Sequence, residues 1–559
     1  MNLKKGLLFF GSWLILFLNS YSQQLNVGLP IYEEYYRRQQ LAGELGSMHS
    51  FMIRPLRLPE LKKDLEDDLF LQIIEEDAKI DLLALPLISR NTYNSKRPYG
   101  WGNKGMLPNV GFQTYLSTGI FAKLGFFELQ LQPEFVFGQN RPFVGFGSDF
   151  STPVLQSRFF YWNNGDNPER FGTSPNSRLW WGQSSAKLNF GAFAIGISTE
   201  NIWWGPGQFN SLTFSDNAEG FPHITLETRN PAKTFLGNFE GQLIVGRLEN
   251  SLLPPTQIDF LNQRYFKDFD GDWRYLNGIS ISYNPIFLPN LFFGFSRTFQ
   301  QYNSLKGDKF LDWFPIFEVF QKEGLFSNGN SVSYDSKGQD QQVVVSFRYL
   351  VPSAKFEIYG EYGRRDHAFN WREFILNPEH ARAYLVGFQK LIALNNADDF
   401  LQIRGEYTHQ QESVNRYIRY PGLIGNQTWH THGLARGFVN RGEALGVGAG
   451  VGSNVMTFEI SKVSKLNKRG ILLERLANHQ DFFYRAFGRS SGRQPWIDYS
   501  IGLLWDQSFE KLTLGTKIQL ISSYNYQWQS NLNRSRDFAQ NELDLALYLN
   551  LNLLYRFGN

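Results

Sequence analysis

The sequence predicts an all-β transmembrane barrel of about 18 antiparallel strands, preceded by a small N-terminal α-helical periplasmic domain. Three observations predict this fold. The chain begins with an export signal, later segments carry apolar residues at every second position, and no later segment is apolar enough for a transmembrane helix. With 559 residues, the chain is long enough for several soluble domains or for one large barrel. The alternation favours the barrel.

The first 22 residues have the layout of a cleavable signal peptide. Lys4 and Lys5 precede an apolar run from Gly6 to Leu18, and Ser20 and Ser22 supply small residues before a cleavage site. The run is shorter than the roughly 20 residues that span a bilayer, so an uncleaved anchor is the weaker alternative. We expect export to the outer membrane of a Gram-negative bacterium, with a mature chain that starts at residue 23.

The alternation is clearest at the C-terminus. Every second residue from Leu543 to Phe557 is apolar, whereas Asp544 and Asn550 lie between them. At ~3.3 Å per residue this strand is about 50 Å long, well beyond the usual strand of a soluble protein. Similar segments recur from about residue 110 onward, and they predict a barrel over residues 96–559 with long loops.

Residues 23–95 show a different pattern. Leu61, Leu65, Leu69 and Ile73 recur every fourth residue after Pro59, which predicts an amphipathic helix. Ile31 to Tyr36 suggests a shorter helix before it. We therefore expect a small periplasmic helical domain at 23–95.

One predicted strand is unusual because its inward face is glycine. Between Glu443 and Ser453, glycines alternate with Leu445, Val447, Ala449 and Val451. Glycines in a strand often mark the close approach of another segment, so an inward-folded loop or plug could pack here. The alternative is that glycine only lets the wall bend.

Composition and motifs argue against several functions. The net charge of +3 is too small for a typical nucleic-acid-binding protein, and the lack of cysteine excludes disulfides and a thiol nucleophile. Asp268 to Asp272 lacks the spacing of a calcium loop, and His430 and His432 lack a third ligand, so no metal and no cofactor are expected. A Gly-x-Ser-x-Gly match around Ser490 lies in a polar connection rather than between a strand and a helix, so no catalytic residue is assigned.

Aromatic and polar clusters give the best functional signal. Flat indole rings can stack on sugar rings, nearby polar side chains can bind hydroxyls, and guanidinium groups can bind the carboxylates of an acidic polysaccharide. The alternatives are an interfacial aromatic girdle, solvated charges or lipopolysaccharide contacts. The candidate polysaccharide-binding residues are Trp180, Trp181, Trp203, Trp204, Asp216, Asn217, Arg489 and Arg493.

Several of these residues also carry a family resemblance. The chain resembles the Wzi family of capsule-assembly outer-membrane proteins in Arg97 to Gly100, in Trp203 to Gly207 with the residues that follow, and in the repeated strands at 356–362 and 401–407. The resemblance implies an 18-stranded barrel, a helical periplasmic domain and a lectin-like role.

We therefore expect a non-enzymatic, monomeric protein that binds and anchors capsular polysaccharide or exopolysaccharide. Its expected partners are that polysaccharide, outer-membrane lipid and lipopolysaccharide, but not nucleic acid. The alternative is a porin-type diffusion channel, and a remote alternative is an outer-membrane serine hydrolase acting through Ser490.

Overall fold

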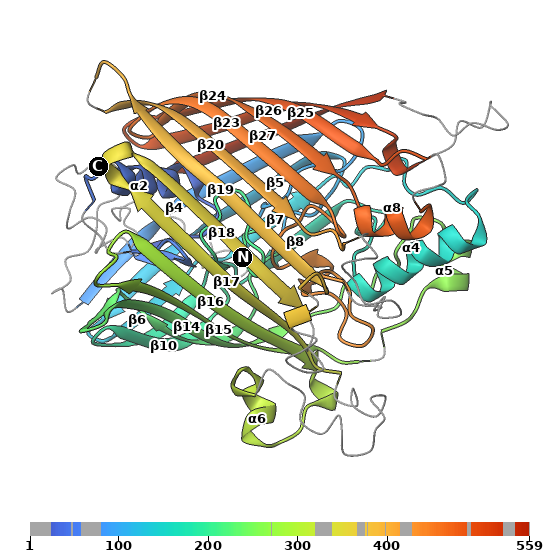
Figure 1. Ribbon diagram of the computed structural model, residues 1–559, viewed down its shortest axis with the longest axis horizontal. Helices are drawn as coiled ribbons and strands as arrows, with labels where there is room; N and C mark the ends of the chain where they lie inside the picture. Colours follow the sequence, from blue (N-terminus) through green and yellow to red (C-terminus); the bar gives the residue numbers. More distant parts are fainter. Residues whose placement is uncertain are drawn as a thin grey trace, which may run out of the picture.

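The computed structural model describes residues 24–45, 49–57, 80–269, 271–318, 338–365, 375–376, 378–396, 398–413, 428–488, 493–528 and 543–557. Its long strands close into one antiparallel barrel with 18 membrane-spanning strands, which confirms the predicted fold class (Figure 1). The first strand, β4 (Ile80–Asn94), pairs with the last, β27 (Leu543–Tyr555), and this pairing closes the cylinder.

Most strands cross the wall without interruption. In chain order they are β5 (Gly111–Leu124), β10 (Phe193–Ser198), β14 (Gly237–Leu248), β15 (Arg274–Pro285), β16 (Leu291–Tyr302), β17 (Asp340–Val351), β18 (Phe356–Arg365), β19 (Arg382–Ala393), β20 (Asp399–His409), β23 (Asn454–Ser464), β24 (Asn467–Ala477), β25 (Ile497–Ser508) and β26 (Leu512–Tyr524). Three crossings are broken into pairs of shorter strands: β6 (Phe127–Leu131) with β7 (Glu134–Gly138), β8 (Asn176–Trp180) with β9 (Ser185–Phe190), and β12 (His223–Thr228) with β13 (Ala232–Thr234).

The wall has an apolar outer face and a polar inner face, as the alternation predicts. On β27, Leu543 and Leu545 are exposed on the outside, whereas Tyr548 is buried on the inside. Elsewhere the inner face carries fully buried charged residues such as Arg348 and Glu357. Because successive side chains of a strand point to opposite faces, this division follows directly from the sequence pattern.

The two ends of the barrel differ in the length of their connections. Short turns lie at the end where β4 begins and β27 ends, which is the periplasmic arrangement of outer-membrane barrels. Long connections lie at the other end, and their described parts carry the helices α4 (Thr152–Gly165), α5 (Asp259–Tyr265), α6 (Phe310–Trp313) and α8 (Gln480–Ala486) (Figure 1). No helix in the described part of the chain is both long and apolar enough to cross a membrane.

The described N-terminal residues form a plug rather than a separate domain, which corrects the expected division at residue 96. β4 already belongs to the barrel wall, and α2 (Pro30–Ala42) packs against the wall near the short turns. Lys355, in one of these turns, donates to the Ala42 carbonyl at 3.1 Å, and Arg38 donates to the Lys465 carbonyl in another at 2.6 Å. We call residues 24–57 the plug, of which 46–48 are not described. The helix predicted from Leu61 to Ile73 lies outside the described residues.

The prediction of a wall strand in the glycine-rich segment is wrong. Glu443 to Ser453 is not a strand of the wall, and only β22 (Glu443–Ala444) is extended there, paired with β21 (Val439–Asn440). Its apolar residues are buried in the interior instead of facing lipid. The close approach expected at its glycines is confirmed, because the Ser215 amide donates to the Leu445 carbonyl at 2.7 Å and a side chain at Gly446 would meet the Leu212 carbonyl.

Candidate functional site

The long connection at 199–222 folds into the barrel and meets the plug. We call it the inward loop. Its short strand β11 (Trp203–Trp204) pairs with β2 (Ile53–Arg54) of the plug, and the Gly205 amide donates to the Met52 carbonyl at 2.8 Å. Gly205 has a φ of 136°, and a Cβ there would lie 2.2 Å from Glu361 of the wall, so glycine is required where loop, plug and wall converge.

The two tryptophans of β11 have different environments. Trp204 is only 1% exposed, its indole Nε1 donates to the Gln242 side chain at 2.8 Å, and its ring packs perpendicular to that of Phe214. Trp204 therefore packs the inward loop rather than offering a face to a ligand. Trp203 stacks under the Arg54 guanidinium at 4.7 Å and borders a cavity.

Asp216 and Asn217 fasten the inward loop to the loop at 95–110. The Lys104 amide donates to the Asp216 carbonyl at 2.6 Å, and the Gly102 amide donates to the Asn217 side chain at 3.2 Å. Burial lowers the pKa of Lys104 to about 8 and raises the pKa of Asp216. Asp216 and Trp203 line the same cavity, whereas Asn217 holds the loops beside it.

This lumenal cavity has a volume of about 220 Å³. It lies between the plug, the loop at 95–110, the inward loop and the inner faces of β20 and β23 to β27. Aromatic rings line it together with charged and amide side chains. The lining residues relevant to its chemistry are Glu34, Tyr99, Trp101, Trp203, Asp216, Arg404, Lys468, Asp506, Gln519 and Asn550.

Trp180 and Trp181 lie on opposite faces of the wall. Trp180 points inward, where it packs against the apolar cluster around α2 and lies beneath the Arg178 guanidinium at 5.1 Å. Trp181 is 69% exposed on the outer face of the wall. The structure therefore does not bring this pair together with Trp203.

Arg493 lies at the extracellular end. Its guanidinium lies 4.3 Å above the ring of Phe487 and 5.1 Å from that of Phe150. These rings belong to an aromatic cluster between α4 and α8, which we call the extracellular cap. Arg489 and Ser490, which the sequence also singled out, lie outside the described residues.

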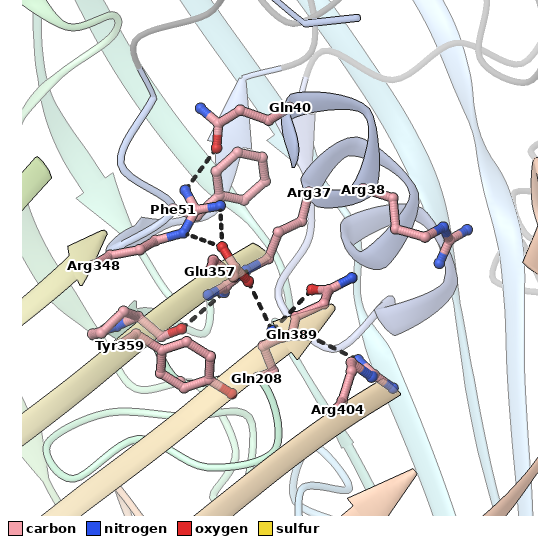
Figure 2. Close-up of polar contacts among 12 residues, drawn as sticks. Arg37, Arg38, Gln40, Phe51, Gln208, Arg348, Glu357, Tyr359, Gln389 and Arg404 are labelled. Carbon is pink, nitrogen blue, oxygen red and sulfur yellow. Dashed lines mark hydrogen bonds and ion pairs between the residues drawn. The ribbon is translucent and has the colours of Figure 1, made fainter. Parts of the chain in front are cut away.

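A buried ionic network that sequence reasoning missed holds α2 in the barrel (Figure 2). Glu357 of β18 receives hydrogen bonds from Arg37 of α2 at 2.6 Å and from Arg348 of β17 at 2.8 Å. Gln208 of the inward loop donates to Glu357 and to Gln389, each at 3.0 Å. The available signal was the inward register of Glu357 in its alternating strand, because a buried charge needs a partner.

A second group of charges adds to this network. Glu34 of α2 pairs with Arg404 at 2.9 Å and with Lys468 at 3.1 Å, and Lys468 also pairs with Asp506 at 3.3 Å. Burial opposes ionisation of Glu34, but the two cations together hold its pKa below the usual value. Glu34 is therefore an anion that links the plug to two strands of the wall, β20 and β24.

Comparison with known proteins identifies the family. The family model described as capsule assembly protein Wzi matches residues 100–470 of this chain, about two thirds of its length. The chain belongs to the Wzi family. This confirms the resemblance that Trp203 to Gly207 and the repeated strands suggested.

A solved structure of a Wzi protein supports the fold. Wzi of Escherichia coli is described as an outer-membrane protein involved in group 1 capsule assembly and as a carbohydrate-binding β-barrel. It superposes with a TM-score of 0.57 at 12% identity, and the match covers 95% of this chain and 99% of that one. A BenF-like porin from Pseudomonas fluorescens Pf-5 matches with a TM-score of 0.38 at 8% identity, over 85% of this chain and 99% of the porin. No curated protein sequence matches the chain.

Proposed function

We propose that this protein is a non-enzymatic, lectin-like barrel of the outer membrane that binds capsular polysaccharide or exopolysaccharide and anchors it at the cell surface. Membership of the Wzi family carries the proposal, because the family is defined by capsule assembly. The carbohydrate binding described for the Escherichia coli protein supports the same class of ligand. The chain reaches the outer membrane after cleavage of residues 1–22 and acts as a monomer in contact with lipid and lipopolysaccharide.

The extracellular end is where a surface polysaccharide meets such a barrel. The long connections gather there, and in the extracellular cap the Arg493 guanidinium packs against the rings of Phe487 and Phe150. A guanidinium group beside aromatic rings suits an acidic polysaccharide, since the charge can bind carboxylates while ring faces contact the apolar sides of sugars. The plug and the inward loop occupy the lumen, which favours anchoring over diffusion through the barrel.

The decisive experiment compares surface polysaccharide in cells with and without the gene. Deletion should move polysaccharide from the cell-bound to the released fraction without reducing the total, and expression of the wild-type chain should restore retention. Arg493→Gln should restore it less well than Lys390→Gln, a control near the short turns, while heat-modifiable gel mobility shows that both barrels assemble. Full retention after deletion would reject the proposed function.

A further inference from the structure

Four residues that line the lumenal cavity each carry a buried polar atom without a partner. Among the described residues, nothing hydrogen-bonds the indole Nε1 of Trp203, the Nε of Arg404, the Oε1 of Gln519 or the Oδ1 of Asn550, and all four atoms are buried. All four residues line the same cavity. A buried donor or acceptor without a partner costs about 1–3 kcal/mol, so four such residues in the lining of one cavity point to something that binds there.

The unpaired atoms specify the chemistry of the ligand. Two are N–H donors and two are carbonyl acceptors, so a group that both donates and accepts can satisfy the whole set. Hydroxyl groups have this property, whereas a carboxylate or phosphate would leave the two acceptors unsatisfied. The cavity therefore favours a molecule with several hydroxyls.

The charges in the lining favour a neutral ligand. Arg404 pairs with Glu34 at 2.9 Å, and Lys468 pairs with Glu34 at 3.1 Å and with Asp506 at 3.3 Å. These charges compensate one another within the wall and the plug. A charged ligand would have to compete with pairs that are already formed, and it would lose its own hydration on entering.

The aromatic residues and the volume limit its shape. Tyr99 and Trp101 lie 6.1 Å apart between ring centres and border the cavity together with Trp203. The volume of about 220 Å³ lies below the range of roughly 300–1,000 Å³ that is typical of pockets for drug-sized ligands, so it suits one small ring rather than a chain.

We propose that the lumenal cavity is a binding site for one neutral, hydroxyl-rich ring, a single sugar unit held between the plug and the inward loop. The choice of a sugar as the hydroxyl-rich ligand rests on the proposed function. The site is separate from the extracellular cap, and it gives Trp203 a role distinct from that of Trp204.

Titration of the purified full chain in detergent tests this site. The probes are D-glucose, D-galactose and D-mannose, with D-glucuronate as the charged comparison, and binding is followed by calorimetry and tryptophan fluorescence. At least one neutral hexose should bind saturably and more tightly than glucuronate. Trp203→Phe keeps a ring but removes the indole N–H, and Asn550→Leu removes an acceptor. Each should weaken binding about tenfold, the value of one lost hydrogen bond.

Trp181→Phe makes the same chemical change on the outer face of the wall and should leave the affinity unchanged. Saturable binding with this pattern of variants supports the proposal. No saturable binding of any neutral hexose, tighter binding of glucuronate, or equal effects of Trp203→Phe and Trp181→Phe would each overturn it. Polysaccharide retention in cells is measured separately, so the two proposals can fail independently. If no sugar binds in the cavity, the proposed function still stands. If deletion of the gene leaves polysaccharide retention unchanged, the proposed function fails, but sugar binding in the cavity is still tested by the titration.

Discussion

Adjacent residues in this protein differ sharply in what they contact, and Trp203 and Trp204 are the clearest case. Both belong to β11, but the strand turns Trp204 into a packed cluster with Phe214 and Gln242, and turns Trp203 toward the lumenal cavity. Replacing both at once would mix a packing effect with a binding effect. The two roles are separated only by single substitutions.

Trp204→Ala should destabilise the barrel interior by about 3–5 kcal/mol, because a large buried ring is removed and leaves a void. Thermal unfolding of the purified protein measures the change. Trp181→Ala removes the same ring from the outer wall and should have a much smaller effect. If both variants melted at the same temperature, Trp204 would not be a packing residue of the inward loop.

The buried group of Arg37, Glu357 and Arg348 predicts a loss of stability when its single anion is replaced. Glu357→Gln removes the anion between two buried guanidinium groups and should cost about 3–5 kcal/mol, because both cations lose their counter-charge. Thermal unfolding measures this loss of stability, and limited proteolysis measures how well the plug is protected. Glu249→Gln breaks an exposed pair with Arg247 and should change stability by less than about 1 kcal/mol. Equal protection of the plug in both variants would contradict the anchoring role of Glu357.

At the scale of elements, the interior is assembled from segments that are distant in sequence. The inward loop contacts both the plug and the glycine-rich segment through backbone groups, as in the hydrogen bonds from the Gly205 amide to the Met52 carbonyl and from the Ser215 amide to the Leu445 carbonyl. Such contacts need residues without side chains at the crossing points. Glycine at 446 meets this need where two backbones cross.

Gly446→Ala should loosen the inward loop, because the added Cβ would lie 2.2 Å from the Leu212 carbonyl. Backbone atoms cannot move aside as a flexible side chain can, so we expect faster proteolysis of the long connections and a lower melting temperature. Gly433→Ala is the matched control, since nothing lies within 4 Å of its added Cβ. A Gly446→Ala protein as resistant to protease as the control would rule out this crossing.

The plug should also respond to acid. The Glu34 pKa is lowered in the folded protein, so its stabilising effect is present above its ordinary value of 4.5 and is lost as the pH falls through the lower folded value. Conductance in planar bilayers should therefore rise only below about pH 4.5. Glu34→Gln should weaken this step, whereas Glu44→Gln, at an exposed position after α2, should preserve it. If the wild type, Glu34→Gln and Glu44→Gln all showed the same rise in conductance at low pH, groups other than Glu34 would cause that rise.

At the scale of the whole molecule, the barrel is a filled cylinder. Its outer face meets lipid, and its lumen holds α2, the inward loop and the glycine-rich segment. This arrangement distinguishes the proposed anchoring role from the porin alternative, which requires a continuous aqueous path.

The wild-type protein at neutral pH should therefore carry little steady current in planar bilayers, compared with a general porin reconstituted in the same way. The physical reason is that the ionic network of Glu357 and Glu34 holds the plug against the wall. Large and steady ohmic steps at neutral pH would favour the diffusion channel instead.

The pattern of residues was sufficient to predict the wall of this protein. Outward and inward positions alternate along strands such as β27, and the cost of exposing polar groups to lipid enforces the same pattern in every strand. The barrel and its approximate number of strands could therefore be predicted from the sequence. Trp203 and Asp216, which the sequence singled out among its aromatic and polar clusters, line the same cavity.

The contents of the lumen were decided only by the tertiary structure. Arg37 and Glu357 are 320 residues apart, and neither periodicity nor composition shows that they meet. The inside of a barrel accepts both polar and apolar residues, so the sequence does not distinguish a helix outside the barrel from one inserted into it. Inside the closed barrel, buried charges and backbone groups must find partners. This requirement fixes the positions of the plug, the inward loop and the cavity between them, and it becomes visible only in the tertiary structure.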